Sequence, residues 1–339
     1  MKAAVFTYRD GLKITDYELG KIEDSQVLVR IRSAGLCASD IHYMDGRYKY
    51  AIEPIIPGHD GSGVIEELGR NVDYFNVGDE VIIDYVWSCG RCKYCLEGRD
   101  NLCKNVKCYG FEMNGTFAEY IIVDSRNLVL KPKHISFDEA AILGCAVVTP
   151  YHAIKNVGGV MNKSIAIVGL GGVGIHLVLL SKLMGAKIVI GIDVDERKYA
   201  FARRYGLDHF INPLIEDPVK RVREITTDGV DISFEFVGSL ETMKTAVEIT
   251  RPGGTILIGG LIHGSVSLNL ESILSLEKRI LTTMDHTHKD LIEITEFINA
   301  REIRLSNSIT HKFKLDDIHK AIELFKQRSE PIVRIVLNP

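Results

Sequence analysis

The stretch from Ser164 to Lys198 reads SIAIVGLGGVGIHLVLLSKLMGAKIVIGIDVDERK. Its apolar run from Ile165 to Val168 predicts a buried strand, and the pattern that follows predicts a helix ending near Met184. A second apolar run ends at Asp193. Strand, helix and strand in this order predict the beginning of a doubly wound parallel sheet.

Between the first strand and the helix, the glycines are spaced as Gly169-x-Gly171-x-x-Gly174, with Gly172 and Val173 in between. This spacing is weak evidence alone, but with the flanking elements and a terminal acid it indicates a dinucleotide site. Glycines let the backbone approach a pyrophosphate, and the helix N-terminus offers free N–H groups.

Asp193 follows the second strand, about 20 residues beyond the glycines. There a carboxylate can accept hydrogen bonds from the adenosine ribose hydroxyls and would repel a 2'-phosphate. We therefore expect NAD rather than NADP, although two cations, Arg197 and Lys198, lie nearby. The alternative is an exposed acid at the end of a strand.

The alternation continues after Asp193. DERKYAFARRYG and LETMKTAVEIT predict helices, whereas VDISFEFVG and GGTILIGG predict strands. The preceding segment has short strands and many turns, which places a domain boundary near residue 147. The tail predicts helices at 290–300 and 315–327 and a closing strand, IVRIVLN.

The chain of 339 residues has a formal net charge of -4, which is too little to gather phosphate backbones or anionic lipids. We expect a small-molecule substrate, with no nucleic acid or membrane partner. The first residues, MKAAVFTYRDGLKI, resemble a strand rather than a secretory signal, so we expect a cytoplasmic protein.

Four of the seven cysteines lie in one loop, spaced as Cys89-x2-Cys92-x2-Cys95-x7-Cys103. In a reducing compartment this clustering favours metal over disulfides. Four thiolates suit a tetrahedral Zn²⁺ with no open position, which is typical of a structural site. Two disulfides, unligated thiols or a [4Fe-4S] cluster remain as alternatives.

Three separate segments supply a second set of donors, Cys37, His59 and Cys145. Singly, the cysteines would more often be buried apolar residues, and the histidine a hydrogen-bonded core residue. Together, two thiolates and one imidazole would leave the fourth position of a zinc ion open, as in a catalytic site.

The chain resembles the zinc-dependent alcohol dehydrogenases of the medium-chain dehydrogenase/reductase family over its whole length. The resemblance is carried by CASDIH, GHDGSGVIEELG, VGDEV, the cysteine loop, LGCAVVT, VGLGGVG and DISFEFVG. It implies a GroES-like, partly open β-barrel catalytic domain (residues 1–147 and 286–339) and a Rossmann NAD-binding domain (residues 148–285). It also implies two Zn²⁺ per chain, a catalytic one on Cys37, His59 and Cys145 and a structural one on the loop.

The resemblance further implies reversible hydride transfer between a primary or secondary alcohol and nicotinamide. Ser39 would accept the alcohol proton and pass it on to His42, and Asp40 would orient His59. Ser39 as a helix cap and His42 as a surface residue are the alternatives. The cofactor contacts implied by position are Thr149, Val173, Lys198 and Arg334.

The chain departs from the family at three places. Thr149 is followed by Pro150, a rigid residue that the first turn of a helix tolerates. Asp60, a possible further metal ligand, stands where the family usually has Glu. Near residue 285 the family often has glycines, whereas this chain reads TTMDHTHKD.

We expect a largely apolar substrate pocket lined by Tyr48, Trp87 and Tyr109. Polyol, diol or amino-alcohol dehydrogenases of the butanediol or threonine type are the alternative among enzymes. Outside enzymes, the alternative is an NAD-binding redox sensor. The family suggests a homodimer or homotetramer.

Overall fold

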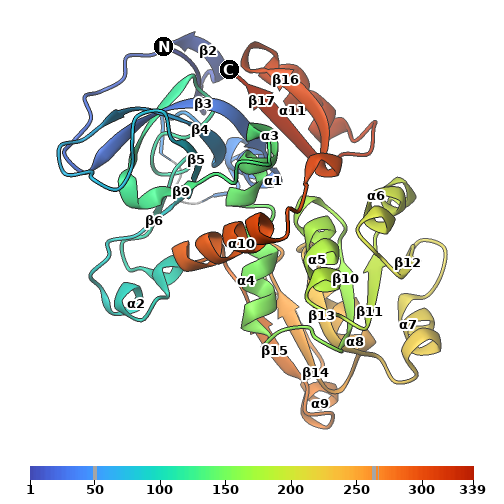
Figure 1. The fold of residues 1–339 in the computed structure, drawn as a ribbon. Coiled ribbons are helices and arrows are strands. Elements are labelled where there is room, and N and C mark those ends of the chain that lie inside the picture. The colour runs from blue at the N-terminus through green and yellow to red at the C-terminus, as the bar shows by residue number, and fades with distance from the viewer. Residues whose placement is uncertain (49–51, 262–264, 266) are drawn as a thin grey trace. The chain divides into compact units, whose positions relative to one another are not determined.

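The computed structural model describes residues 1–48, 52–261, 265 and 267–339. The chain divides into two compact units: the first joins Met1–Val148 to Asp285–Pro339, and the second is Thr149–Met284. The predicted limits lie one residue from these. Each unit has its own hydrophobic core, and both chain ends lie in the first unit (Figure 1).

The second unit contains a six-stranded sheet that is parallel throughout, in the order β12-β11-β10-β13-β14-β15. Its central strands are rich in Ile and Val and buried on both faces, as parallel strands covered by helices require. The strands are β10 (Ser164–Val168), β11 (Ile188–Ile192), β12 (His209–Ile211), β13 (Val230–Glu235), β14 (Thr250–Ile258) and β15 (Arg279–Thr282).

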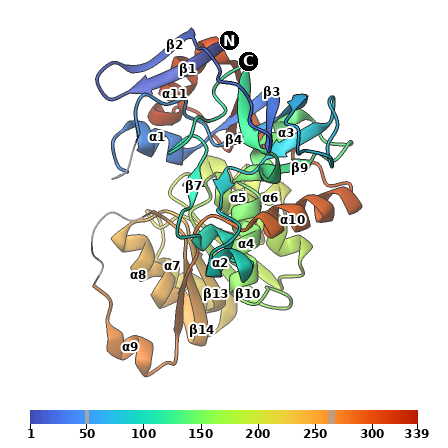
Figure 2. The same cartoon turned by 90° about the vertical axis from the view of Figure 1, so that its left-hand side faces the viewer.

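Helices cover both faces of this sheet, with α5 and α6 on one face and α7 and α8 on the other (Figure 2). Asp217 and Ser239 cap α7 and α8 by accepting N–H groups of the first turn. The helices of this unit are α4 (Val148–Asn156, beginning at the last residue of the first unit), α5 (Gly172–Leu183), α6 (Tyr199–Arg204), α7 (Pro218–Thr226), α8 (Leu240–Ile249) and α9 (Leu270–Leu274). The predicted doubly wound sheet is thereby confirmed.

The first unit is built on a seven-stranded sheet in the order β16-β17-β3-β4-β5-β9, with β8 also paired to β3. The closing strand β17 is antiparallel to β3, so the tail of the chain completes the sheet that its beginning starts. The strands are β3 (Gln26–Leu36), β4 (Asp60–Leu68), β5 (Glu80–Ile83), β8 (Tyr120–Asp124), β9 (Leu128–Leu130), β16 (Ile309–Lys314) and β17 (Arg334–Asn338). Two small two-stranded sheets pair β1 (Lys2–Thr7) with β2 (Gly11–Asp16) and β6 (Val86–Trp87) with β7 (Lys107–Cys108).

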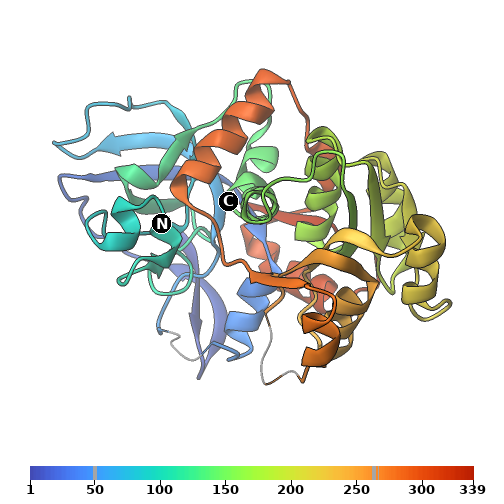
Figure 3. The same cartoon turned by 90° about the horizontal axis from the view of Figure 1, so that it is seen from below.

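Short helices fill the connections of the first unit. Figure 3 shows α10 beginning beside the cysteine-bearing loop, where the His288 N–H donates to Asp100 at 3.0 Å. The helices are α1 (Ala38–Met44), α2 (Lys93–Leu96), α3 (Phe137–Ala141), α10 (His288–Ala300) and α11 (Ile318–Gln327). Single 3₁₀ turns in the chain lie at Asp100–Leu102, Ser125–Asn127, Ile142–Gly144, Glu196–Lys198, Ser306–Ser308 and Leu315–Asp317.

Among the described residues, none of the helices combines the length and the apolar character that crossing a membrane requires.

Candidate functional site

The four loop cysteines gather into one cluster. Their sulfurs lie within 4.8 Å of one another, and all four are free thiols. Three sulfur pairs are 3.5, 3.9 and 4.0 Å apart. Four sulfurs about 2.3 Å from a central Zn²⁺ in a tetrahedron would be about 3.8 Å apart. The cluster therefore fits a zinc ion with no position left for substrate.

Backbone N–H groups point at these sulfurs. Those of Cys89 and Asn105 each lie 3.3 Å from the Cys103 sulfur. Backbone N–H groups of Cys95 and Lys104 lower the pKa of Cys92 to about 6. These contacts favour the thiolate at Cys92, the form in which cysteine binds metal, whereas burial raises the pKa of Cys103 to about 11.

The second donor set comes from three distant parts of the first unit. Cys37 follows β3 and is the N-cap of α1, His59 directly precedes β4, and Cys145 follows a 3₁₀ turn. Their donor atoms lie within 4.8 Å of one another, and all three residues are buried. Two buried thiols and one buried imidazole at this spacing fit a zinc ion that keeps one open position.

Asp40 fixes two of these donors. One carboxylate oxygen lies 2.8 Å from His59 Nδ1, and the other accepts the Cys37 N–H at 2.8 Å. The first contact engages Nδ1, which leaves Nε2 of His59 for a metal. The second closes a capping box at the start of α1.

Neighbouring charges shift the protonation of the set. The Cys145 thiol, followed by Arg334 and His59, lowers the pKa of Cys37 well below its usual value despite burial. Burial opposes a charge on His59, but Asp40 and Cys37 outweigh it and raise the pKa of His59 to about 10. The pocket therefore favours a Cys37 thiolate even before a metal binds.

Asp60 adjoins this set but is not one of its donors. Among the described residues its carboxylate pairs with Arg334, and both side chains are buried. The shorter side chain of Asp60 therefore reaches Arg334. The guanidinium predicted to approach the pyrophosphate already has an anionic partner here.

The two residues of the predicted proton relay lie on α1. Ser39 is the second residue of the helix, with Oγ 4.0 Å from the Cys37 sulfur, and His42 lies in the last turn. The helix cap is Cys37 rather than Ser39. A hydrogen bond from Ser39 also acts on the Tyr48 hydroxyl, whose pKa is raised chiefly by burial.

The aromatic surroundings of His59 differ from those predicted. Its ring lies 4.9 Å from Tyr85 and 5.1 Å from Phe111, and Tyr48 lies 5.5 Å from Phe111. Sequence reasoning named Tyr48 but missed Tyr85 and Phe111, because nothing in their local sequence marks their side chains as facing His59.

The side chains of Trp87 and Tyr109, both predicted to line the substrate pocket, contact Asp124. The Trp87 indole N–H lies 3.3 Å from the Asp124 carboxylate, and the Tyr109 hydroxyl accepts the Asp124 N–H at 2.9 Å. Tyr109 is only 2% exposed. These contacts place both rings around Asp124, which does not favour the predicted pocket role.

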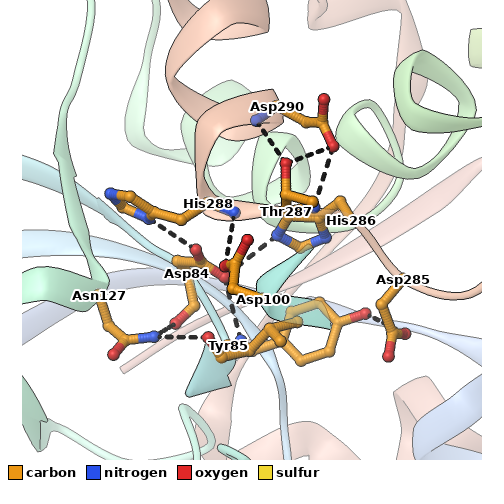
Figure 4. Close-up of polar contacts among 10 residues, drawn as sticks. Asp84, Tyr85, Asp100, Asn127, Asp285, His286, Thr287, His288 and Asp290 are labelled. Carbon is orange, nitrogen blue, oxygen red and sulfur yellow. Dashed lines mark hydrogen bonds and ion pairs between the residues drawn. The ribbon is translucent and has the colours of Figure 1, made fainter. Parts of the chain in front are cut away.

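A polar cluster missed by the sequence reasoning lies beside Tyr85 (Figure 4). Asp84 is buried, and its two carboxylate oxygens lie 3.1 Å from His286 Nε2 and 2.8 Å from His288 Nδ1. The Tyr85 hydroxyl donates to Asp285 at 2.8 Å. Asp285, His286 and His288, from the segment where the family often has glycines, are therefore held by the two residues that link β5 to β6.

In the second unit, the glycine-rich turn has the backbone that a dinucleotide site requires. Gly169 has φ +97°, and a Cβ at Gly174 would lie 1.9 Å from the Gly169 carbonyl oxygen. Asp193 follows β11 and accepts the Leu170 N–H at 2.7 Å, while Lys198 Nζ lies 2.9 Å from the same carboxylate. Val173 is the second residue of α5, and Thr149 lies in α4.

Comparisons with known proteins agree with this geometry. Residues 23–133 match the alcohol dehydrogenase GroES-like domain, and residues 172–300 match the zinc-binding dehydrogenase domain. An alcohol dehydrogenase of Geobacillus stearothermophilus is 32% identical over 94% of this chain and 95% of its own length. The chain belongs to the zinc-binding dehydrogenase family.

Other members of the zinc-binding dehydrogenase family differ in substrate. The sorbitol dehydrogenase of Bacillus subtilis is 31% identical over the full length of this chain and 97% of its own. The solved alcohol dehydrogenase of Thermus sp. ATN1 is 26% identical, with a TM-score of 0.93, over 100% of this chain and 99% of that one. The protein is thus an oxidoreductase of the medium-chain dehydrogenase/reductase family, with the GroES-like and Rossmann folds of its zinc-dependent alcohol dehydrogenases.

Proposed function

We propose that this protein is an NAD-dependent alcohol dehydrogenase with two zinc ions per chain. It would interconvert a primary or secondary alcohol and its aldehyde or ketone. The observation that carries the proposal is the convergence of Cys37, His59 and Cys145 within 4.8 Å. Family membership supports the reaction class.

Cys37, His59 and Cys145 would hold the catalytic zinc, and the four loop cysteines the structural one. Bound there, zinc would lower the pKa of an alcohol in its open position. Two thiolates balance the charge of a divalent cation, and Asp40 keeps His59 in the tautomer that offers Nε2. The three donor residues are buried, so water is largely excluded from them.

Ser39 would accept the alcohol proton. Its position on α1, one residue past Ala38, keeps its hydroxyl near the Cys37 sulfur. His42 would receive the proton at the outer end of the relay, because an imidazole titrates near neutral pH.

The charges around Asp193 support NAD over NADP. Lys198 is paired with Asp193, and Arg197 is paired with Asp195 at 2.8 Å. A 2'-phosphate would therefore meet carboxylates whose cations are already engaged. We also retain Thr149, Val173, Lys198 and Arg334 as proposed cofactor contacts.

The substrate is proposed to be a small molecule. The sorbitol dehydrogenase among the relatives keeps a polyol open as the alternative substrate class. We propose a homodimer or homotetramer, since β15 ends the parallel sheet with one edge unpaired among the described residues.

The decisive experiment measures zinc per chain together with NAD reduction over a panel of alcohols, diols and polyols. We expect two zinc ions and activity that Cys37→Ser abolishes. Cys108→Ser is the matched control, because this thiol belongs to neither cluster. Retained zinc and NAD binding without alcohol-dependent reduction would support a redox sensor and overturn the proposal.

A further inference from the structure

The Tyr85 side chain contacts both the Asp285 carboxylate and His59, one of the three proposed ligands of the catalytic zinc. It accepts the Tyr85 hydroxyl at 2.8 Å, and the Tyr85 ring packs edge-on against His59 with ring centroids 4.9 Å apart. Figure 4 shows the Tyr85 hydroxyl pointing at Asp285. A fixed negative charge therefore stands close to the place where an alcohol would bind.

Among the residues that the structure describes, this carboxylate has no cationic partner, and it accepts a hydrogen bond from the Tyr85 hydroxyl. It is only partly exposed. A partly buried carboxylate without a countercharge favours a cation beside it.

A second carboxylate, that of Glu112, accepts the Cys108 N–H at 2.8 Å. Glu112 follows Phe111, whose ring lies 5.1 Å from that of His59. Burial raises the pKa of Glu112, and the charge of Asp285 raises it further. The two acids therefore lie close enough to repel each other, which a cation near Asp285 would relieve.

The neighbours of Tyr85 and the backbone conformation of Asp285 restrict the orientation of the Asp285 side chain. The Tyr85 ring packs at 5.4 Å against His286, which is fully buried and held by Asp84. The backbone of Asp285 has φ +50°, a left-handed conformation that Asp adopts more readily than most residues. A charge held in this way is preorganised and loses little entropy on binding a ligand.

We propose that Asp285 makes this enzyme selective for alcohols that carry a protonated amine near the reacting carbon. The inference rests on the proposed alcohol dehydrogenase function and narrows its substrate class. It replaces the largely apolar pocket expected from the sequence with one that has a polar, anionic end. Asp285 is thus a specificity-determining residue, and Tyr85 is the positioning residue that holds it.

The test compares two alcohols of nearly equal size, 1-amino-2-propanol and 2-butanol, at about pH 7.5, where an aliphatic amine is protonated. We expect the wild-type kcat/KM to favour the amino alcohol. Asp285→Asn should lower kcat/KM for the amino alcohol by about 10- to 100-fold, the range of a hydrogen bond to a charged group. Its kcat/KM for 2-butanol should stay the same or rise.

Two further variants separate selectivity from folding. Tyr85→Phe keeps the Asp285 carboxylate but removes the hydroxyl that orients it. This variant should therefore lower the preference for the amino alcohol less than Asp285→Asn does. Asp316→Asn, an exposed acid paired with Lys2, is the matched surface control. Zinc content and thermal unfolding of each variant are measured alongside.

The outcomes distinguish the two proposals. A wild-type preference for 2-butanol, or an equal loss for both alcohols in Asp285→Asn, overturns the selectivity and leaves the dehydrogenase intact. A changed KM for NAD with both alcohols would assign Asp285 to the cofactor instead and also overturns it. Failure of every alcohol to reduce NAD overturns the dehydrogenase function itself.

Discussion

The Asp40 carboxylate lies 2.8 Å from His59 Nδ1, and both side chains are buried. The same carboxylate holds the Cys37 N–H at 2.8 Å. One side chain therefore sets the orientation of two of the three donors proposed for the catalytic zinc.

Asp40→Asn should weaken zinc binding at this site by about 10- to 100-fold, the usual cost of losing a partner of a ligating histidine. The amide loses the charge that favours the correct His59 tautomer. Competition with a chelator, followed by zinc content per chain, measures the change. Asp45→Asn, at the other end of α1, is the control and should retain both metals. Unchanged chelator resistance in Asp40→Asn would contradict the positioning role.

Cys92→Ser should remove one zinc ion per chain and leave the other. Three sulfurs of the cluster no longer complete a tetrahedron, so the loop from Ser88 to Cys103 should lose order and the melting temperature should fall. Metal analysis and thermal unfolding, with Cys108→Ser as control, measure both effects. Loss of both metals together would argue against two independent sites.

The buried pair of Asp60 and Arg334 gives a stability prediction. Asp60→Ala leaves the Arg334 guanidinium buried without its carboxylate, which should reduce the free energy of unfolding by about 3–5 kcal/mol. The double variant Asp60→Ala with Arg334→Leu removes both charges and should recover much of that loss. Urea unfolding of the three proteins measures these differences. A double variant as unstable as Asp60→Ala alone would show that the pair's charges are not the cause.

The contact between Asp84 and His288 predicts a pH dependence of stability. Burial alone would lower the pKa of His288, but its hydrogen bond to Asp84 and the charges of Asp84 and Asp100 outweigh burial and an opposing Arg126, so the pKa is raised. A raised folded pKa means that the stabilisation is complete below the unfolded value of about 6.5 and is lost as pH rises through the folded value.

Burial alone would raise the pKa of Asp84, but the charges and hydrogen bonds of His286 and His288 outweigh burial, so the pKa is lowered. The stabilisation that the Asp84 carboxylate contributes to the folded protein is therefore present above about pH 3.9 and is lost in acid. His288→Gln should therefore destabilise the protein most at about pH 5–6 and least at about pH 9. Urea unfolding across this range, with the exposed Lys289→Gln as control, tests the difference. A destabilisation independent of pH would show that the pair is not ionised.

Asp193→Asn should relax the preference for NAD. The substitution removes the carboxylate that would repel a 2'-phosphate and releases Lys198 from its ion pair. The ratio of kcat/KM for NAD to that for NADP should fall by about 10-fold or more, in line with the loss of a charged hydrogen bond. An unchanged ratio would show that Asp193 does not discriminate between NAD and NADP.

Features coded by local spacing could be predicted from the sequence. The strand, turn and helix from Ser164 to Leu183 follow from an apolar period and glycine positions, and their bounds are found within a residue or two. The four-cysteine cluster was equally predictable, because its donors lie within one loop. The Cys37, His59 and Cys145 set required the resemblance, since no local pattern joins them.

What the sequence by itself determined is therefore the alternation that builds the parallel sheet, the dinucleotide turn and the cysteine loop, since each rests on interactions between near neighbours. Only the tertiary structure decided that Asp60 pairs with Arg334, 274 residues away, and that Tyr85 holds Asp285, 200 residues away. Such contacts depend on how β17 and the start of α10 return to the first unit. A side chain's distant partner is set by that packing, and no periodicity along the chain encodes it.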